Sequence, residues 1–353
     1  MSGDDGSTEP TQPSRVAIGI SFGNTNSSIA YTTATEGKAE VIANEEGDRQ
    51  IPSILSYVSG EEFQGTQAKA QMVRNPTNTI AYFRDFLGKS FNDIDPTPCH
   101  ASAHPVEVDG GKGVGFVVQE AGPPTSPSES EGDAQVERKE PEKSTLSVPE
   151  VSTRYLHKLK QSASDFLGKS VNAAVITIPT DFSDEQKTAL SKSAQNAGIE
   201  VLQFIPEPVS ALLAYDAKTQ LSGEATGTQQ QDKIILVADL GGTRSDVAVI
   251  ASRGGMYSTL STAHDYELGG SALDQVLIEY AAKEFLKKHK TAKDPRQSER
   301  SLAKLTLEAE NVKKALSLSS SATFSVESLS DGIDFSLTVN RTRYELLANK
   351  VMG

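Results

Sequence analysis

Residues 17–28 read Ala-Ile-Gly-Ile-Ser-Phe-Gly-Asn-Thr-Asn-Ser-Ser, and residues 237–246 read Val-Ala-Asp-Leu-Gly-Gly-Thr-Arg-Ser-Asp. Aligned without gaps, the two stretches place Gly23 opposite Gly241. Each lies between two β-rich runs, which predicts a hairpin with a Gly/Thr turn. Glycine lets the backbone approach an anion closely, and successive N–H groups in such a turn form a concave site for phosphate. Two such turns predict two related halves that close on one phosphorylated ligand.

Length, charge and cysteine content limit the class of protein. A chain of 353 residues has room for two or three domains and a substantial core. Its net charge of −13 argues against direct nucleic-acid binding. A single cysteine, Cys99, excludes an internal disulfide, and the five scattered histidines lack metal-ligand spacing. With no signal pattern and no membrane-spanning apolar run, we expect a cytoplasmic protein without a membrane contact.

Three stretches have compositions that cannot form a packed core. Residues 1–14 are predicted to be a disordered tail, residues 121–144 a disordered insert, and residues 219–232 a low-complexity loop. The remaining sequence divides into a first lobe at 15–218, which contains the insert, and a second lobe at 233–353.

Strands and helices alternate outside these stretches, which predicts an α/β chain with mixed sheets. Capping-box patterns begin two of the helices, at Ser147 and Ser183, and Asp331-Gly332 predicts a hairpin turn. Uninterrupted apolar runs predict strands buried on both faces at 171–178 and 234–238. The other predicted strands are 16–20, 28–32, 39–42, 53–58, 114–118, 201–204, 323–326 and 333–339. The predicted helices are 148–166, 184–197, 207–215, 271–289, 298–316 and one that begins near 342.

The order of motifs along residues 16–351 resembles the ATPase domain of the seventy-kilodalton heat-shock (DnaK-type) chaperones. The matching motifs lie at 18–27, 75–79, 83–88, 174–179, 207–215, 239–246, 268–274 and 343–345. The resemblance implies an actin-like (ribonuclease-H-like) fold of two lobes. The family continues with a further strand and glycine turn, so the second lobe is expected to be truncated at its C-terminus.

The resemblance also implies a site for ATP and Mg²⁺. It places at the phosphates Gly23, Asn24, Thr25, Lys69, Gly241, Gly242, Thr243, Arg244, Gly269 and Gly270. It places around the adenosine Glu310, Lys313, Lys314 and Ser317, which share one helix face. Without the resemblance, that face would be interpreted as solvated charge. Glu207 and Asp239 match acids that act on Mg²⁺ through water, the contact that this ion favours. Lys69, Glu207 and Asp246 are the candidates for a catalytic role.

Two departures from the family pattern bear on hydrolysis. Ser21 stands where the family has an aspartate, and Thr243-Arg244 replace its third glycine and following threonine. Phosphoryl transfer depends on positioning and charge neutralisation. Arg244 could assist transfer as an arginine finger, or it could pair with the phosphate or Asp246 and hold ATP as a static ligand. The loss of the acid at Ser21 favours the second interpretation, with ATP bound and turned over slowly or not at all.

These departures resemble an atypical branch of the family that pairs with the J-protein zuotin in the ribosome-associated complex. The resemblance implies a chaperone subunit that supports co-translational folding. Its partners would be a zuotin-type J-protein, the ribosome indirectly, and a conventional heat-shock chaperone. A working ATPase with a conventional nucleotide cycle is the alternative. A sugar or acetate kinase of the same superfamily is less favoured, because Ser21 occupies the position of a catalytic aspartate.

Overall fold

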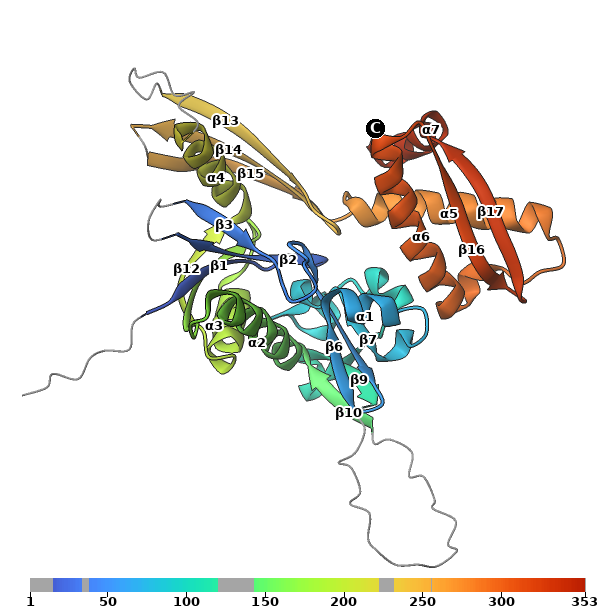
Figure 1. The fold of residues 1–353 in the computed structure, drawn as a ribbon, viewed down its shortest axis with the longest axis horizontal. Coiled ribbons are helices and arrows are strands. Elements are labelled where there is room, and N and C mark those ends of the chain that lie inside the picture. Colours follow the sequence, from blue (N-terminus) through green and yellow to red (C-terminus); the bar gives the residue numbers. More distant parts are fainter. Residues whose placement is uncertain (1–14, 34–37, 120–142, 222–231, 255, 353) are drawn as a thin grey trace, which may run out of the picture.

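The computed structural model describes residues 15–33, 38–119, 143–221, 232–254 and 256–352 (Figure 1). The predicted tail at 1–14 lies outside them, as do residues 121–142 of the predicted insert at 121–144 and residues 222–231 of the predicted loop at 219–232. Residues 15–221 are called the N-terminal half below, and residues 232–352 the C-terminal half. Within the described residues, no helix combines the length and apolar composition needed to cross a membrane.

A six-stranded mixed sheet forms the centre of the N-terminal half. Its strands follow the order β12-β11-β1-β2-β3, and β4 also pairs with β2. They are β1 (Ala17–Ser21), β2 (Asn26–Thr32), β3 (Ala39–Ile42), β4 (Ile51–Pro52), β11 (Ala173–Ile178) and β12 (Glu200–Pro206). β1 pairs in parallel with β11 and antiparallel with β2. The predicted burial of β11 is confirmed for most of the strand: Ala173, Ala174 and Ile176 are fully buried, whereas Val175 and Thr177 are partly buried.

Two helices, α2 (Val148–Leu167) and α3 (Asp184–Asn196), pack against each other beside this sheet. Ser183 and Gln186 form the complete predicted capping box, with both reciprocal hydrogen bonds. At α2 only half of the predicted box forms: the Ser147 hydroxyl accepts from the Glu150 N–H. The other half is absent because the Glu150 carboxylate pairs with Arg154, 2.8 Å away.

Two small sheets complete the N-terminal half. The first contains β5 (Ile54–Val58), β6 (Glu61–Gln64) and β7 (Thr79–Ala81), with α1 (Gly65–Gln71) packed on β5. The second contains β8 (Pro105–Val108), β9 (Gly113–Gln119) and β10 (Lys143–Ser147). Short 3₁₀ helices are η1 (Pro76–Asn78), η2 (Arg84–Phe86), η3 (Phe91–Asp93), η4 (Thr97–Ala101), η5 (Asp109–Gly111) and, in the C-terminal half, η6 (Pro295–Gln297).

The C-terminal half begins with an antiparallel sheet of β13 (Lys233–Leu240), β14 (Ser245–Arg253) and β15 (Met256–Asp265). Helix α4 (Glu207–Leu221) packs on one face, where Leu212 contacts Ala248 and Ile250. The prediction that 234–238 is buried on both faces was wrong. Ile234 and Leu236 are 71% and 67% exposed. Strand β13 lies at the edge of its sheet, and these two side chains lie on the face opposite to the one that helix α4 covers.

The remaining elements form a separate unit, drawn in orange and red in Figure 1. Helices α5 (Gly270–Lys288) and α6 (Glu299–Leu318) pack together, and the β16 (Ser321–Ser330) and β17 (Ile333–Asn340) hairpin packs on α6. Helix α7 (Arg341–Met352) follows. The predicted hairpin turn is confirmed. Asp331 and Gly332 both have positive φ, 51° and 75°, as a type I′ turn requires.

The two hairpins anticipated from the repeated sequence have the same register. In the first, β1–β2, Ser21 lies opposite Ser28, and in the second, β13–β14, Asp239 lies opposite Asp246. These are the pairs that the gapless alignment superimposes. The duplication is therefore confirmed at the level of backbone pairing.

Each turn begins with a glycine because the carbonyl oxygen of the residue three positions later leaves no room for a side chain. A Cβ on Gly23 would lie 2.1 Å from the Asn26 carbonyl oxygen, and a Cβ on Gly241 would lie 2.7 Å from the Arg244 carbonyl oxygen. In the second turn the Gly241 N–H donates to that same oxygen at 2.9 Å. Any side chain at either position would open the turn.

Candidate functional site

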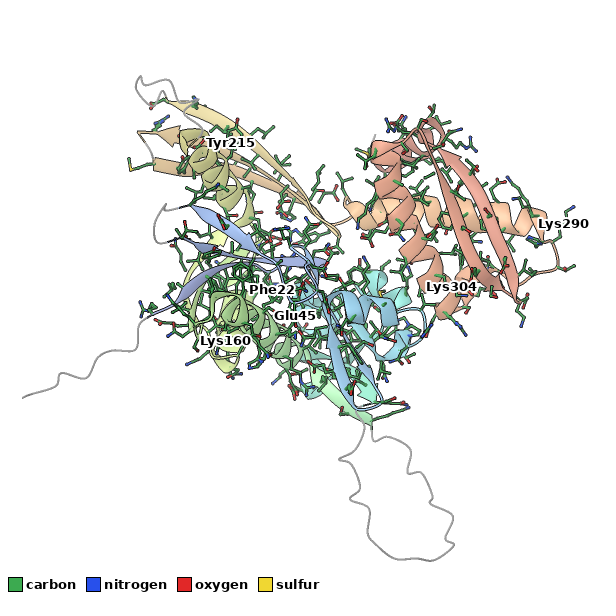
Figure 2. All side chains as sticks on the ribbon, viewed as in Figure 1. Phe22, Glu45, Lys160, Tyr215, Lys290 and Lys304 are labelled. Atoms are coloured by element: carbon green, nitrogen blue, oxygen red, sulfur yellow. The ribbon has the colours of Figure 1, made fainter. Side chains whose placement is uncertain are left out.

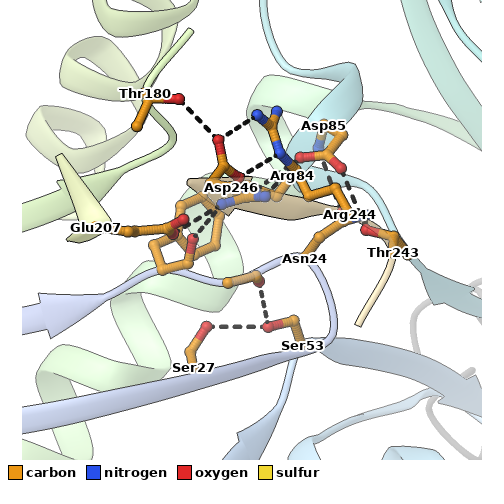
Figure 3. A network of polar contacts seen from close by, with 12 residues as sticks. Asn24, Ser27, Ser53, Arg84, Asp85, Thr180, Glu207, Thr243, Arg244 and Asp246 are labelled. Atoms are coloured by element: carbon orange, nitrogen blue, oxygen red, sulfur yellow. Dashed lines mark hydrogen bonds and ion pairs between the residues drawn. The ribbon is translucent and has the colours of Figure 1, made fainter. Parts of the chain in front are cut away.

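The two glycine turns, more than two hundred residues apart in sequence, meet in space. A Cβ on Gly242 would lie 2.3–2.8 Å from three side-chain atoms of Thr25. Beside this contact, the Asn24 amide donates to the Thr243 hydroxyl at 3.0 Å (Figure 3). The turns therefore face each other across the junction between the halves, as the repeated sequence predicts.

The first turn is supported from within the N-terminal half. The Ser53 hydroxyl donates to the Gly23 carbonyl at 2.7 Å and lies 2.9 Å from the Ser27 hydroxyl (Figure 3). Beneath the turn, the Phe22 ring is fully buried (Figure 2) and lies 6.1 Å from the rings of both Phe83 and Tyr155. Ser53 was not predicted, because a lone serine after a short strand carries no sequence signal.

The second turn is supported by the start of helix α5. The Gly270 N–H donates to the Gly241 carbonyl at 2.9 Å, and the Ser271 N–H donates to the Gly242 carbonyl at 2.7 Å. The Lys313 ammonium donates to the Gly270 carbonyl at 2.8 Å. The predicted third glycine contact, Gly269-Gly270, therefore lies directly against the second turn.

A cavity of about 290 Å³ opens at this junction. The structure brings nine of the predicted site residues to its wall: Asn24, Thr25, Lys69, Gly241, Gly242, Gly270, Glu310, Lys313 and Lys314. The wall of the cavity also contains residues that were not predicted, including Tyr82, His100 and Ile278. The predicted residues Gly23, Glu207, Asp239, Thr243, Arg244, Asp246, Gly269 and Ser317 do not line it.

Charged side chains at the cavity pair across the two halves. Lys69, predicted to lie near the terminal phosphate, donates to Glu310 at 2.5 Å, and Lys314 donates to the other oxygen of that carboxylate at 2.6 Å. Although burial opposes it, these two ammonium groups lower the pKa of Glu310. Ser317 bonds back to the Lys313 carbonyl within its own helix, 3.4 Å away.

Arg84 is a buried cation that the sequence interpretation did not single out. Its side chain is 4% exposed and pairs with Asp85 at 2.8 Å and with Glu207 at 3.1 Å (Figure 3). It also donates to the Phe22 carbonyl at 3.3 Å, just before the first glycine turn. The signal was present in the Phe-Arg-Asp-Phe motif, which places two charges inside an apolar run.

Arg244 points away from the cavity, into a cluster of acids. It forms a bidentate pair with Asp246, with Nε and Nη2 at 2.8 and 2.7 Å from the two oxygens. Nη2 also donates to Asp181 at 2.7 Å, and the guanidinium lies 4.6 Å from the centroid of the Tyr266 ring. Thr180 donates to Asp246 at 2.7 Å (Figure 3). Asp181 and Tyr266 were not predicted, since neither belongs to a recognisable motif.

The two acids predicted to act on a metal ion have the electrostatics of such a site. Burial raises the pKa of Glu207, with Arg84 opposing and Asp239 adding to the rise. Burial also raises the pKa of Asp239, reinforced by the charge of Asp246. A hydrated divalent cation would relieve this repulsion, so both residues fit Mg²⁺ held through water. The ion would supply charge neutralisation at phosphate oxygens. Among the described residues, no three acidic, histidine or cysteine side chains are grouped for direct coordination.

Comparison with known proteins agrees with this arrangement. The Hsp70 protein family matches residues 17–353. The chain is 47% identical over 95% of its length to the ribosome-associated complex subunit SSZ1 of Saccharomyces cerevisiae, 57% of which is covered. It is 43% identical over 96% of its length to a heat shock protein 70 homolog of Schizosaccharomyces pombe, 55% of which is covered. It is 35% identical over 96% of its length to heat shock 70 kDa protein 14 of Danio rerio, 61% of which is covered.

The chain belongs to the Hsp70 family. Within that family it is similar to SSZ1, as the substitutions in the second glycine turn predicted. It spans 55% to 61% of the length of these three relatives.

Proposed function

We propose that this chain is the nucleotide-binding part of an Hsp70-type chaperone subunit, which binds ATP with Mg²⁺ and hydrolyses it slowly or not at all. Its two halves would correspond to the two lobes of an actin-like ATPase domain. The observation that carries the proposal is the meeting of two duplicated glycine turns at one cavity, beside Lys69, Lys313 and Lys314. Backbone N–H groups and ammonium groups together suit a polyphosphate.

The surroundings of Asp246 support slow hydrolysis. A carboxylate that positions or activates water needs unused acceptor sites, but Asp246 already accepts two hydrogen bonds from Arg244 and one from Thr180, three of the about four that its two oxygens can accept. Ser21, where the family has an aspartate, contributes no negative charge to the metal. Glu207 remains beside the first turn, but its carboxylate is paired with Arg84.

The similarity to SSZ1 supports a place in the cytoplasm in a ribosome-associated complex. There the chain would pair with a zuotin-type J-protein, contact the ribosome through it, and assist a conventional heat-shock chaperone with nascent chains. Copurification of tagged chain with such a J-protein tests this part separately from nucleotide binding.

Calorimetry of the chain with Mg-ATP tests the nucleotide proposal, with Lys69→Met and Lys304→Met as a matched pair. Lys69 lines the cavity, whereas Lys304 lies on α6 and donates to the carbonyls of Glu327 and Ser328. A charge-assisted hydrogen bond contributes roughly 1.5–3 kcal/mol, so Lys69→Met should weaken ATP binding about tenfold or more. Lys304→Met should leave it unchanged. No heat with ATP, or equal effects of both substitutions, would contradict the proposal.

A further inference from the structure

One cluster of charged and aromatic side chains joins the two halves away from the cavity. Thr180 and Asp181 follow strand β11 in the N-terminal half. Arg244 and Asp246 belong to the β13–β14 turn region, and Tyr266 follows β15. These five residues are called the latch below.

Three hydrogen bonds of the latch cross from one half to the other. Arg244 donates to Asp181 at 2.7 Å, and Thr180 donates to Asp246 at 2.7 Å. The Tyr266 hydroxyl donates to the second oxygen of Asp181. Arg244 thereby bridges a carboxylate of its own hairpin and a carboxylate of the other half.

Two of the five latch residues are sheltered from water and carry opposite charges. Asp246 is 2% exposed and Arg244 is 6% exposed. Bonds from Tyr266 and Arg244 lower the pKa of Asp181 although burial opposes them. His264 lies beside the cluster, with its Nε2 3.8 Å from an Asp181 oxygen. Separating the halves would take the Arg244 and Tyr266 hydrogen bonds from Asp181, whose side chain is 24% exposed, and the Thr180 hydrogen bond from the buried Asp246.

We propose that Arg244 is an interdomain latch residue, which fixes the second glycine turn to the Thr180-Asp181 segment whether or not a nucleotide is bound. Arg244 therefore acts on the site through position: it keeps the two turns in contact and does not bind phosphate. Three of its five N–H donors are committed to Asp181 and Asp246. The proposal goes beyond ATP binding, since it concerns the chain with no ligand.

A distance measurement between the halves tests the latch directly. Spin labels on Ser170→Cys and Ser258→Cys, both exposed positions, report on the N-terminal half and on β15. Cys99 does not interfere, because it is fully buried and burial raises its pKa to about 12. Four versions of the doubly labelled chain are compared: one without a further change, and three that carry Arg244→Thr, Asp181→Asn or the matched control Arg253→Thr. Arg253 lies on the same strand as Asp246, is exposed, and is 3.9 Å from Asp232.

With no nucleotide, the native chain and the Arg253→Thr control should give one narrow distance distribution. Arg244→Thr and Asp181→Asn should broaden it or shift it to longer distances. If Arg244→Thr fails to fold, Asp181→Asn carries the test, because it is isosteric at a partly exposed position and leaves the Arg244–Asp246 pair intact. Distributions as narrow as the native one in every folded variant would overturn the proposal.

A second measurement separates a latch from a phosphate ligand, and this arm rests on the proposed function. Calorimetry of Arg244→Thr should show ATP and ADP weakened by the same factor. A loss confined to ATP would assign Arg244 to the terminal phosphate and overturn the latch. If the native chain binds neither nucleotide, the proposed function fails, while the distance measurement still decides the latch.

Discussion

Replacing Gly242 by alanine tests the contact between the two turns. The added methyl would lie 2.3 Å from Thr25 Cγ2, 2.4 Å from Oγ1 and 2.8 Å from Cβ. Rotation of the Thr25 side chain moves the first two atoms but leaves Cβ in place, so the turns must separate. Overpacking of this kind costs about 1–3 kcal/mol. Because the turns line the cavity, the affinity for ATP should fall together with stability.

Gly19→Ala is the matched control. In strand β1 the nearest atom to its added Cβ is the Ala30 carbonyl oxygen at 3.9 Å, an ordinary contact. That substitution should be neutral, or stabilise by up to about 1 kcal/mol, because alanine loses less backbone entropy than glycine. The assay is the denaturant midpoint, with calorimetry for ATP. Adding Thr25→Gly to Gly242→Ala should recover part of the loss. If Gly242→Ala behaves like Gly19→Ala, the turns do not touch and the reasoning is refuted.

Four further substitutions test particular contacts. Burial raises the pKa of Asp274 to about 6, above its ordinary 3.8, so its charged form destabilises the fold as pH rises through 4 to 6. The difference in free energy of unfolding between Asp274→Asn and the native chain should therefore shift in favour of the variant by up to about 3 kcal/mol as pH rises from 4 to 7. A difference that does not change with pH would contradict this. Arg84→Met leaves Glu207 buried without its partner and should lower the free energy of unfolding by about 3–5 kcal/mol; a midpoint near the native one would show that Glu207 is neutral or solvated. Ser183→Ala breaks the capping box and should cost about 0.5–2 kcal/mol, whereas Ser147→Ala, at a box only half formed, should cost less; equal midpoints would reject the ranking.

Elements with strong periodicity or end signals were predictable from the sequence. Helix α3 begins at its capping box and α2 ends at Gly168, which has the left-handed φ of 61° that favours glycine. The β16–β17 hairpin follows from alternating apolar residues and an Asp-Gly turn. In each case the signal lies within a few residues of the structure that it specifies.

Strand β15 shows why other elements were missed. Its sequence, Met-Tyr-Ser-Thr-Leu-Ser-Thr-Ala-His-Asp, is polar and almost wholly exposed, so no apolar alternation marks it. It forms because it can pair along β14. The burial of β13 was overestimated for a related reason: an apolar run does not reveal whether both faces of a strand are covered, and Ile234 and Leu236 lie on the exposed one.

The backbone conformation of the site was predictable from the sequence, but the pairing of its charged side chains was not. The glycine turns specify a local conformation, and the repeat indicated that two of them belong together. Which carboxylate pairs with which cation depends on tertiary placement. Arg244 bonds Asp181, 63 residues away, and Lys69 bonds Glu310, 241 residues away. Nothing in a single sequence specifies such partners.

A single-turnover measurement with labelled Mg-ATP tests whether the chain hydrolyses the ATP that it binds. The chain, and a longer protein that includes it, would be loaded with ATP, freed of unbound nucleotide and followed for release of phosphate with and without a J-protein. We expect bound ATP to be recovered largely intact and the J-protein not to accelerate its loss. Rapid, J-protein-stimulated conversion to ADP and phosphate would contradict it and show a conventional ATPase cycle.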